Sequence, residues 1–176
     1  GDPAQERVAA ALENLATKLD AYEPGRKPLF GFGRAQTPPR GLYIHGPVGR
    51  GKSMLMDLFY ENVAYAPKRR VHFHDFMAEV HATVKRWREK DPGNEIARTA
   101  ADIRASAALL CFDEFQVLDI ADAMILARLF ETLFESGIVV VATSNRPPRE
   151  LYENGINRQL FVPAIELIEQ CMDVMC

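Results

Sequence analysis

A glycine-rich segment carries the strongest chemical signal in the chain. It reads Gly46-Pro47-Val48-Gly49-Arg50-Gly51-Lys52-Ser53 and matches the pattern G-x-x-x-x-G-K-[ST] in full. Glycines let backbone N–H groups approach phosphate oxygens closely, and the dipole of a following helix favours negative charge. The Lys52 ammonium would reach the β- and γ-phosphates, and the Ser53 hydroxyl would ligate Mg²⁺. The residues that we expect to contact a nucleotide are Gly46, Pro47, Val48, Gly49, Arg50, Gly51, Lys52, Ser53 and Met54.

A second motif consists of two acids at the end of an apolar run. Residues 109–112 read Leu-Leu-Cys-Phe, and Asp113 and Glu114 follow them. In P-loop ATPases we expect such a strand beside the P-loop strand, with its first acid on Mg²⁺ and its second as the general base that activates water. Two acids after a strand more often belong to a solvated loop, but the P-loop upstream favours the functional interpretation. The motif therefore predicts Asp113 as a metal ligand together with Ser53, and Glu114 as the base.

Asn145 follows another apolar strand, and two interpretations of it are open. Residues 138–141 read Ile-Val-Val-Val and lead through Ala-Thr-Ser into Asn145. A neutral carboxamide at a strand end can position the attacking water without repelling phosphate. Alternatively, Asn145 only begins the turn at residues 146–148, where asparagine is common. With both motifs upstream, the pattern favours a sensor role for Asn145 beside the γ-phosphate.

The elements that must hold these motifs alternate between strands and helices. Short apolar runs predict strands over residues 42–44, 71–74, 107–112 and 138–141. Helical periodicity predicts helices over residues 5–21, 52–62, 76–90 and 94–105, and a further helix that Asp119 caps and Gly137 ends. A loop with several prolines and glycines is expected over residues 22–40. The alternation predicts an α/β fold, with a mainly parallel sheet between helical layers.

Length and composition limit the class of protein. The 176 residues suit one domain, since domains commonly hold roughly 100–200 residues. With 48% hydrophobic and 26% charged residues, the composition is globular rather than disordered. The longest apolar run, residues 107–112, is far shorter than the ~20 residues that span a bilayer. Cys111, Cys171 and Cys176 lack metal-like spacing, which indicates free thiols in a reducing compartment such as the cytoplasm.

Taken together, the three motifs resemble the AAA+ ATPases, and the finer pattern is similar to the ZapE family of cell-division ATPases and its mitochondrial relatives. The segments that carry this resemblance are residues 38–43 (PPRGLY), 71–77 (VHFHDFM) with Val80 and His81, 111–115 (CFDEF), 144–148 (SNRPP) with Leu151 and Tyr152, and 154–163 (NGINRQLFVP). The resemblance covers about residues 22–175, whereas the P-loop alone would indicate only an NTPase.

The resemblance implies a RecA-like αβα core that binds ATP or ADP with Mg²⁺, hydrolyses ATP and works as a homo-oligomeric ring. It also implies a protein partner that is remodelled in cell division or membrane-associated quality control, and a location in the cytoplasm or at the periphery of the inner membrane. Arg158 is implied as the arginine finger for a neighbouring subunit, with Arg146 and Arg149 as competitors. AAA+ proteins normally carry a C-terminal helical lid. We expect residues 1–176 to be a single core domain without that lid.

Three other functions are compatible with a P-loop. A helicase loader or replication initiator would act on DNA, but the net charge of −3 and the absence of a helix-turn-helix signature disfavour nucleic acid as a partner. A small-molecule kinase would need no Asp-Glu strand end. A nucleotide-controlled scaffold would not need a general base such as Glu114.

Two groups of residues outside these motifs could have functions of their own. His72, His74 and His81 could bind a metal, with His72 and His74 on one face of a strand, although zinc sites usually add cysteine or acid ligands. A basic patch for anionic lipid or nucleic acid could comprise Lys68, Arg69, Arg70, Lys85, Arg86 and Arg88. We expect structural roles for the histidines, or a surface that faces a partner, and a solvated surface for the basic residues.

Overall fold

The centre of the protein is a parallel five-stranded sheet. A computed structural model describes residues 2–22, 37–49 and 51–176. The strands are β1 (Gly41–His45), β2 (Lys68–His72), β3 (Leu109–Asp113), β4 (Val139–Ser144) and β5 (Met172–Met175). Their order across the sheet is β2-β3-β4-β1-β5, and each neighbouring pair is parallel. The carboxyl ends of all five strands therefore lie at one edge of the sheet, where the three predicted motifs also lie.

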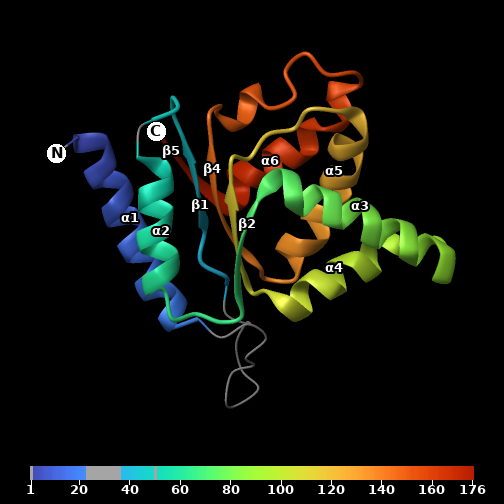
Figure 1. Ribbon diagram of the computed structural model, residues 1–176, viewed down its shortest axis with the longest axis horizontal. Coiled ribbons are helices and arrows are strands. Elements are labelled where there is room, and N and C mark those ends of the chain that lie inside the picture. Colours follow the sequence, from blue (N-terminus) through green and yellow to red (C-terminus); the bar gives the residue numbers. More distant parts are fainter. Residues whose placement is uncertain (1, 23–36, 50) are drawn as a thin grey trace.

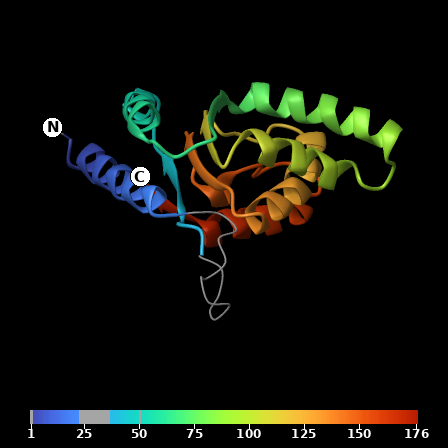
Figure 2. The ribbon, with the colours of Figure 1, turned by 90° about the horizontal axis from the view of Figure 1, so that it is seen from below.

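Helices cover both faces of this sheet. They are α1 (Pro3–Asp20), α2 (Lys52–Asn62), α3 (Phe73–Lys90), α4 (Glu95–Ser106), α5 (Ile120–Glu135) and α6 (Val162–Cys171), with short 3₁₀ turns η1 (Pro148–Glu150) and η2 (Arg158–Leu160). Figures 1 and 2 show α1 and α2 on one side of the sheet and α3, α4 and α5 on the other. None of the described helices combines the length and apolar character that crossing a membrane requires. The predicted αβα fold is confirmed.

Alternation along the strands gives the sheet two separate cores. In β4, Val139 and Val141 pack with the α1 and α2 layer, whereas Val140 and Ala142 pack with α3 to α6. Both faces of β4 are buried, and this explains why residues 139–142 form a continuous apolar run rather than an alternating one.

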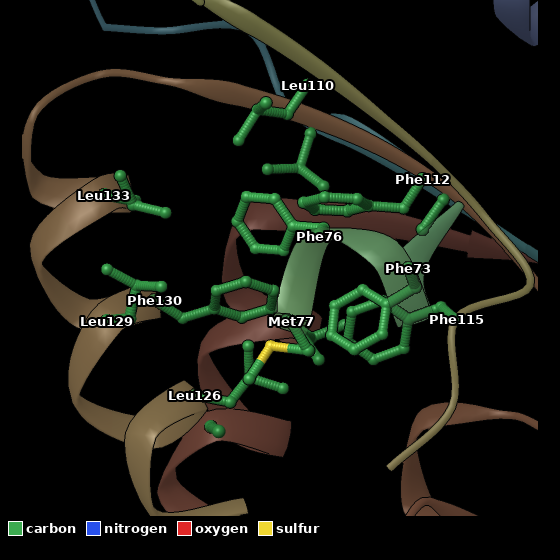
Figure 3. Packing of buried hydrophobic residues seen from close by; sticks show 14 of the residues in the cluster. Phe73, Phe76, Met77, Leu110, Phe112, Phe115, Leu126, Leu129, Phe130 and Leu133 are labelled. Atoms are coloured by element: carbon green, nitrogen blue, oxygen red, sulfur yellow. The ribbon is translucent and has the colours of Figure 1, made fainter. Parts of the chain in front are cut away.

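An aromatic cluster joins α3 to the segment that follows β3 (Figure 3). The ring centroids of Phe73 and Phe115 are 4.2 Å apart, and those of Phe76 and Phe112 are 4.7 Å apart. Each such pair contributes about 0.5–1.5 kcal/mol beyond its buried area. Because Phe112 and Phe115 bracket the two acids, this packing fixes the chain on either side of Asp113 and Glu114.

The structure corrects two sequence predictions. The acid-bearing strand β3 does not lie beside the P-loop strand, because β4 pairs with both and lies between them. The strand predicted over residues 71–74 lies earlier, at Lys68–His72, and α3 begins at Phe73. His74 is therefore in a helix, and it does not share a strand face with His72. The prediction missed the first residues of β2 because they are basic. Charged side chains are tolerated there because β2 is an edge strand.

The remaining elements agree closely with prediction, apart from the chain's end. The helix predicted over residues 52–62 has those bounds, and Asp119 caps α5 by accepting a hydrogen bond from the Asp122 N–H. Helix α6 and strand β5 were not predicted. Of the loop predicted over residues 22–40, residues 23–36 lie outside the described residues, and β1 begins before its predicted start.

Candidate nucleotide-binding site

The glycine-rich loop joins β1 to α2 in the strand–loop–helix arrangement that phosphate binding requires. Gly49 has a φ of 83° and Gly51 a φ of 78°, both in the left-handed region that glycine adopts without strain. Gly51 is the N-cap of α2 and provides no capping side chain, so the first N–H groups of this helix keep their capacity to bind an anion. Arg50 lies outside the described residues.

One cavity brings together most of the predicted site residues. It has a volume of about 250 Å³. Its lining residues are Val48, Gly49, Gly51, Lys52, Ser53, Met54, Glu114, Thr143, Ser144 and Asn145. The P-loop, the end of β3 and the end of β4 thus converge on one space, although Lys52 and Asn145 are far apart in sequence. Asp113 is not part of this lining.

Lys52 contacts the loop that it follows. Its ammonium donates hydrogen bonds to the carbonyl oxygens of Gly46, at 2.7 Å, and Pro47, at 2.8 Å. Burial lowers the pKa of this ammonium. Lys52 also lines a second cavity of about 350 Å³, which Gly46 and Pro47 share with the start of α1. The side chain therefore stands between two spaces, in the half-buried surroundings that strengthen attraction to phosphate.

Asp113 is held by an arginine from the neighbouring strand. Arg70 on β2 donates from Nε and Nη2 to the two carboxylate oxygens, at 2.7 and 2.9 Å, and from Nη1 to Asp57 on α2. Both hydrogen bonds to Asp113 are charge-assisted and parallel, which is the strongest arrangement for this pair. A carboxylate has about four lone-pair sites, so this bidentate contact leaves acceptor capacity for a metal or its water ligands.

Glu114 has an unusual backbone and an exposed side chain. Its φ of 55° is in the left-handed region, which is uncommon for a residue with a Cβ atom. The side chain is 67% exposed, and its Oε2 lies 2.8 Å from Nε2 of His72 at the end of β2. Glu114 is thus presented to the cavity from a constrained position and has a titratable group beside it.

The basic residues of β2 do not form the patch that the sequence suggested. Lys68 donates to the carbonyl oxygens of Tyr60 and Val63 at the end of α2. Arg69 points toward the opposite layer and pairs with Glu79 on α3, at 2.5 Å. With Arg70 engaged by two carboxylates, all three side chains have partners within the protein, and the residues of β2 are half-buried.

The histidines also have separate partners. His81 on α3 lies 2.5 Å from an Asp122 oxygen on α5, whereas His72 contacts Glu114. The two histidines thus contact acids in different parts of the chain. Within the described residues, no group of three or more His, Cys, Asp or Glu side chains is arranged to hold a metal ion.

The arginines predicted near a subunit boundary lie in the segment after β4. Arg158 is in η2 and donates to the carbonyl oxygens of Leu151, at 3.3 Å, and Arg149, at 2.5 Å. Arg146 lies 3.6 Å from Glu153, and Arg149 lies 2.7 Å from Glu169. Arg158 does not line either of the two cavities described above.

Sequence reasoning did not identify Arg70, His72 or Thr143 as neighbours of the two acids. Each contacts Asp113 or Glu114 from a neighbouring strand, so the contact depends on strand order. The sequence does show basic residues at positions 70 and 72 and acids at positions 113 and 114. Their pairing becomes apparent only from the register of β2 with β3, in which His72 lies opposite Asp113.

Comparisons with known proteins show the family to which the chain is similar. The chain matches the AFG1-like ATPase family over residues 1–176. It is 51% identical to the cell division protein ZapE of Escherichia coli (strain K12), over 79% of this chain and 36% of that protein. It is 48% identical to lactation elevated protein 1 homolog B of Danio rerio, over 90% of this chain and 32% of that protein. The chain thus spans about a third of the length of these two relatives.

Solved structures show the same fold. Domain III of the Thermotoga maritima replication initiation protein DnaA is similar with a TM-score of 0.65 and 19% identity, over 99% of this chain and 62% of that one. The DnaC helicase loader is similar with a TM-score of 0.60 and 12% identity, over 99% of this chain and 90% of that one. At these identities the similarity concerns the AAA+ fold alone.

Proposed function

Because the chain belongs to the AFG1-like ATPase family, we propose that it binds ATP with Mg²⁺ at the P-loop and hydrolyses it to ADP and phosphate. The observation that supports this most is the cavity of about 250 Å³, which Lys52 and Ser53 share with Glu114 and Asn145. A site that only stored a nucleotide would need the loop, but not a carboxylate and a carboxamide facing it from two other strands.

The loop and the first acid would bind the substrate and its metal. Loop N–H groups and the start of α2 would bind the phosphates, and Lys52 would exchange its carbonyl contacts for phosphate oxygens. Ser53 and Asp113 provide hydroxyl and carboxylate oxygens, the ligand types that Mg²⁺ prefers. When bound, Mg²⁺ would neutralise charge on the phosphates.

The second acid and the carboxamide would act on water. Glu114 would accept a proton from a water molecule as that water attacks the γ-phosphate, with Asn145 orienting the water by hydrogen bonding. His72 lies within hydrogen-bonding distance of Glu114, so the carboxylate must leave this contact or share it when it accepts the proton.

Assembly and partner are further parts of the proposal. The ring that we infer would bring an arginine from a neighbouring subunit to the γ-phosphate. We assign this role to Arg158, whose two hydrogen bonds leave N–H donors of its guanidinium for such a contact. Similarity to a protein named for cell division supports a partner protein that the ATPase remodels, in division or in membrane-associated quality control.

Replacing the two acids separately tests the division of roles. Glu114→Gln should leave ATP bound while slowing phosphate release by roughly 10²–10⁴-fold, the usual contribution of a general base. Asp113→Ala should instead weaken the part of ATP binding that depends on Mg²⁺. Identical behaviour of the two variants at every Mg²⁺ concentration would contradict the assignment.

A further inference from the structure

Two buried hydroxyl side chains end β4, a strand whose residues are all buried. Thr143 is 3% exposed and Ser144 is 2% exposed, directly after the run of valines and alanine in β4. A buried hydroxyl without a partner is costly, so such residues are retained in a core where they make specific hydrogen bonds. Both residues also line the cavity that Glu114 and Asn145 share.

Thr143 holds the backbone at Glu114. Its Oγ1 accepts a hydrogen bond from the Glu114 N–H at 3.2 Å, and its carbonyl oxygen accepts one from the Phe115 N–H at 2.7 Å. Two successive N–H groups beyond the end of β3 are thus bound by one residue of β4. This contact lies where Glu114 has its φ of 55°.

Ser144 joins the same segment to the chain around Asn145. Its hydroxyl donates to the Phe115 carbonyl oxygen at 2.8 Å and accepts from the Arg146 N–H at 3.2 Å. The Tyr43 hydroxyl, from β1, donates to the Arg146 carbonyl oxygen at 2.6 Å. The hydroxyls of Thr143 and Ser144 therefore bridge the segment that carries Glu114 and the segment that carries Asn145.

We propose that Thr143 and Ser144 are positioning residues for hydrolysis. Thr143 holds Glu114 in its left-handed conformation, and Ser144 sets the distance between Glu114 and Asn145. A glutamate in this backbone region is strained and persists only where surrounding contacts impose it. Without the Thr143 hydroxyl, the Glu114 N–H loses its acceptor and the backbone can relax, which moves the carboxylate. The proposal rests on the proposed role of Glu114 as the base.

Thr143→Val tests the first half because valine keeps the shape and removes only the hydroxyl. We expect kcat to fall roughly 10- to 100-fold, since small displacements of reacting groups cost about this much. The affinity for ATP should stay within about twofold, because Lys52 and the loop are unchanged. Thr143→Ser, which restores the hydroxyl, should recover most of kcat. Equal rates for Thr143→Val and the parent protein would overturn the proposal.

Thr99→Val is a matched control. Thr99 is also a buried threonine, 1% exposed, and its hydroxyl donates to the Glu95 carbonyl oxygen within α4, away from the cavity. The Thr99→Val variant should lose stability without loss of kcat. If both valine variants lowered kcat and thermal stability in parallel, the role of Thr143 would be structural only.

A double variant separates this proposal from the proposed function. If Thr143 acts through Glu114, adding Thr143→Val to Glu114→Gln should leave the residual rate unchanged, because the two effects are not additive. An equal fold-loss in both backgrounds would show that Thr143 does not act through Glu114. Full activity of Glu114→Gln alone would instead refute the proposed function of Glu114.

Amide hydrogen exchange gives a readout that needs no turnover. The Glu114 amide should exchange roughly tenfold faster in Thr143→Val than in the parent protein, because its acceptor is gone. In Thr99→Val the exchange of this amide should be unchanged. Unaltered exchange at Glu114 in Thr143→Val would contradict the positioning role, whatever the rates are.

Discussion

Removing the positive charge of Arg70 should destabilise the fold more than any other change on β2. Arg70→Met keeps most of the side chain's length and apolar contacts but leaves Asp113 without its bidentate partner. It also breaks the contact with Asp57, which links β2 to the helix that begins at Lys52. The expected loss of stability arises because Asp113 would remain largely buried without a partner for its charge.

The burial of the pair sets the magnitude. The side chains of Arg70 and Asp113 are 21% and 20% exposed. Removing one partner of a fully buried ion pair costs about 3–5 kcal/mol, whereas exposed pairs contribute about 0–1 kcal/mol. Since this pair retains some contact with solvent, we expect a loss of about 2–3 kcal/mol. For a chain of this length, that lowers Tm by roughly 4–12 °C.

Thermal and denaturant unfolding of Arg70→Met and Arg69→Met provide the assay. Arg69 neighbours Arg70 and also pairs with an acid, but the side chains of Arg69 and Glu79 are 32% and 54% exposed. We expect Arg69→Met to cost less than about 1 kcal/mol. Equal losses for the two variants, or no loss for Arg70→Met, would refute the reasoning from burial.

Three other predictions concern the cysteines and the ring. Burial raises the pKa of Cys111 to about 12, so a thiol reagent should label exposed Cys176 in the native protein and reach Cys111 only after unfolding, as peptide mapping would show. Because the folded-state pKa of Cys111 lies above its ordinary value of 9.0, its contribution to stability should be complete below pH 9 and decline toward pH 12. Arg158→Ala should bind ATP normally but hydrolyse it slowly in assembled rings, and mixing it with Lys52→Ala should restore some phosphate release. Full activity of Arg158→Ala in such rings would contradict the finger role.

The parts of the fold that the sequence predicts well are those with local signals. The P-loop and α2 depend on a contiguous motif followed by helical periodicity, and the helix predicted over residues 52–62 has those bounds. Strand β3 was identified because an apolar run buried on both faces is followed abruptly by acids. These signals also place Glu114 and Asn145 correctly at strand ends, and the structure brings both to one cavity with Lys52.

Local sequence signals could not predict the order of the strands or identify the edge strand β2. The chain carries no local mark that β4 would lie between β1 and β3, so the position predicted for the acid-bearing strand was wrong. Strand β2 begins with Lys68 and two arginines, which have little β-strand character until their acid partners are known. The Arg70–Asp113 pair joins residues 43 positions apart, and therefore only the assembled sheet reveals it.

Binding of Mg·ATP to the parent protein and to Lys52→Ala, measured by titration calorimetry, tests the central claim most directly. Lys52 is the one cation of the described P-loop residues that line the cavity of about 250 Å³, and its half-buried position strengthens its attraction to phosphate. We predict saturable binding by the parent protein, at least tenfold weaker binding by Lys52→Ala, and no change in Lys85→Ala, whose lysine is exposed on α3. Equal affinity of Lys52→Ala and the parent protein for Mg·ATP would contradict the account.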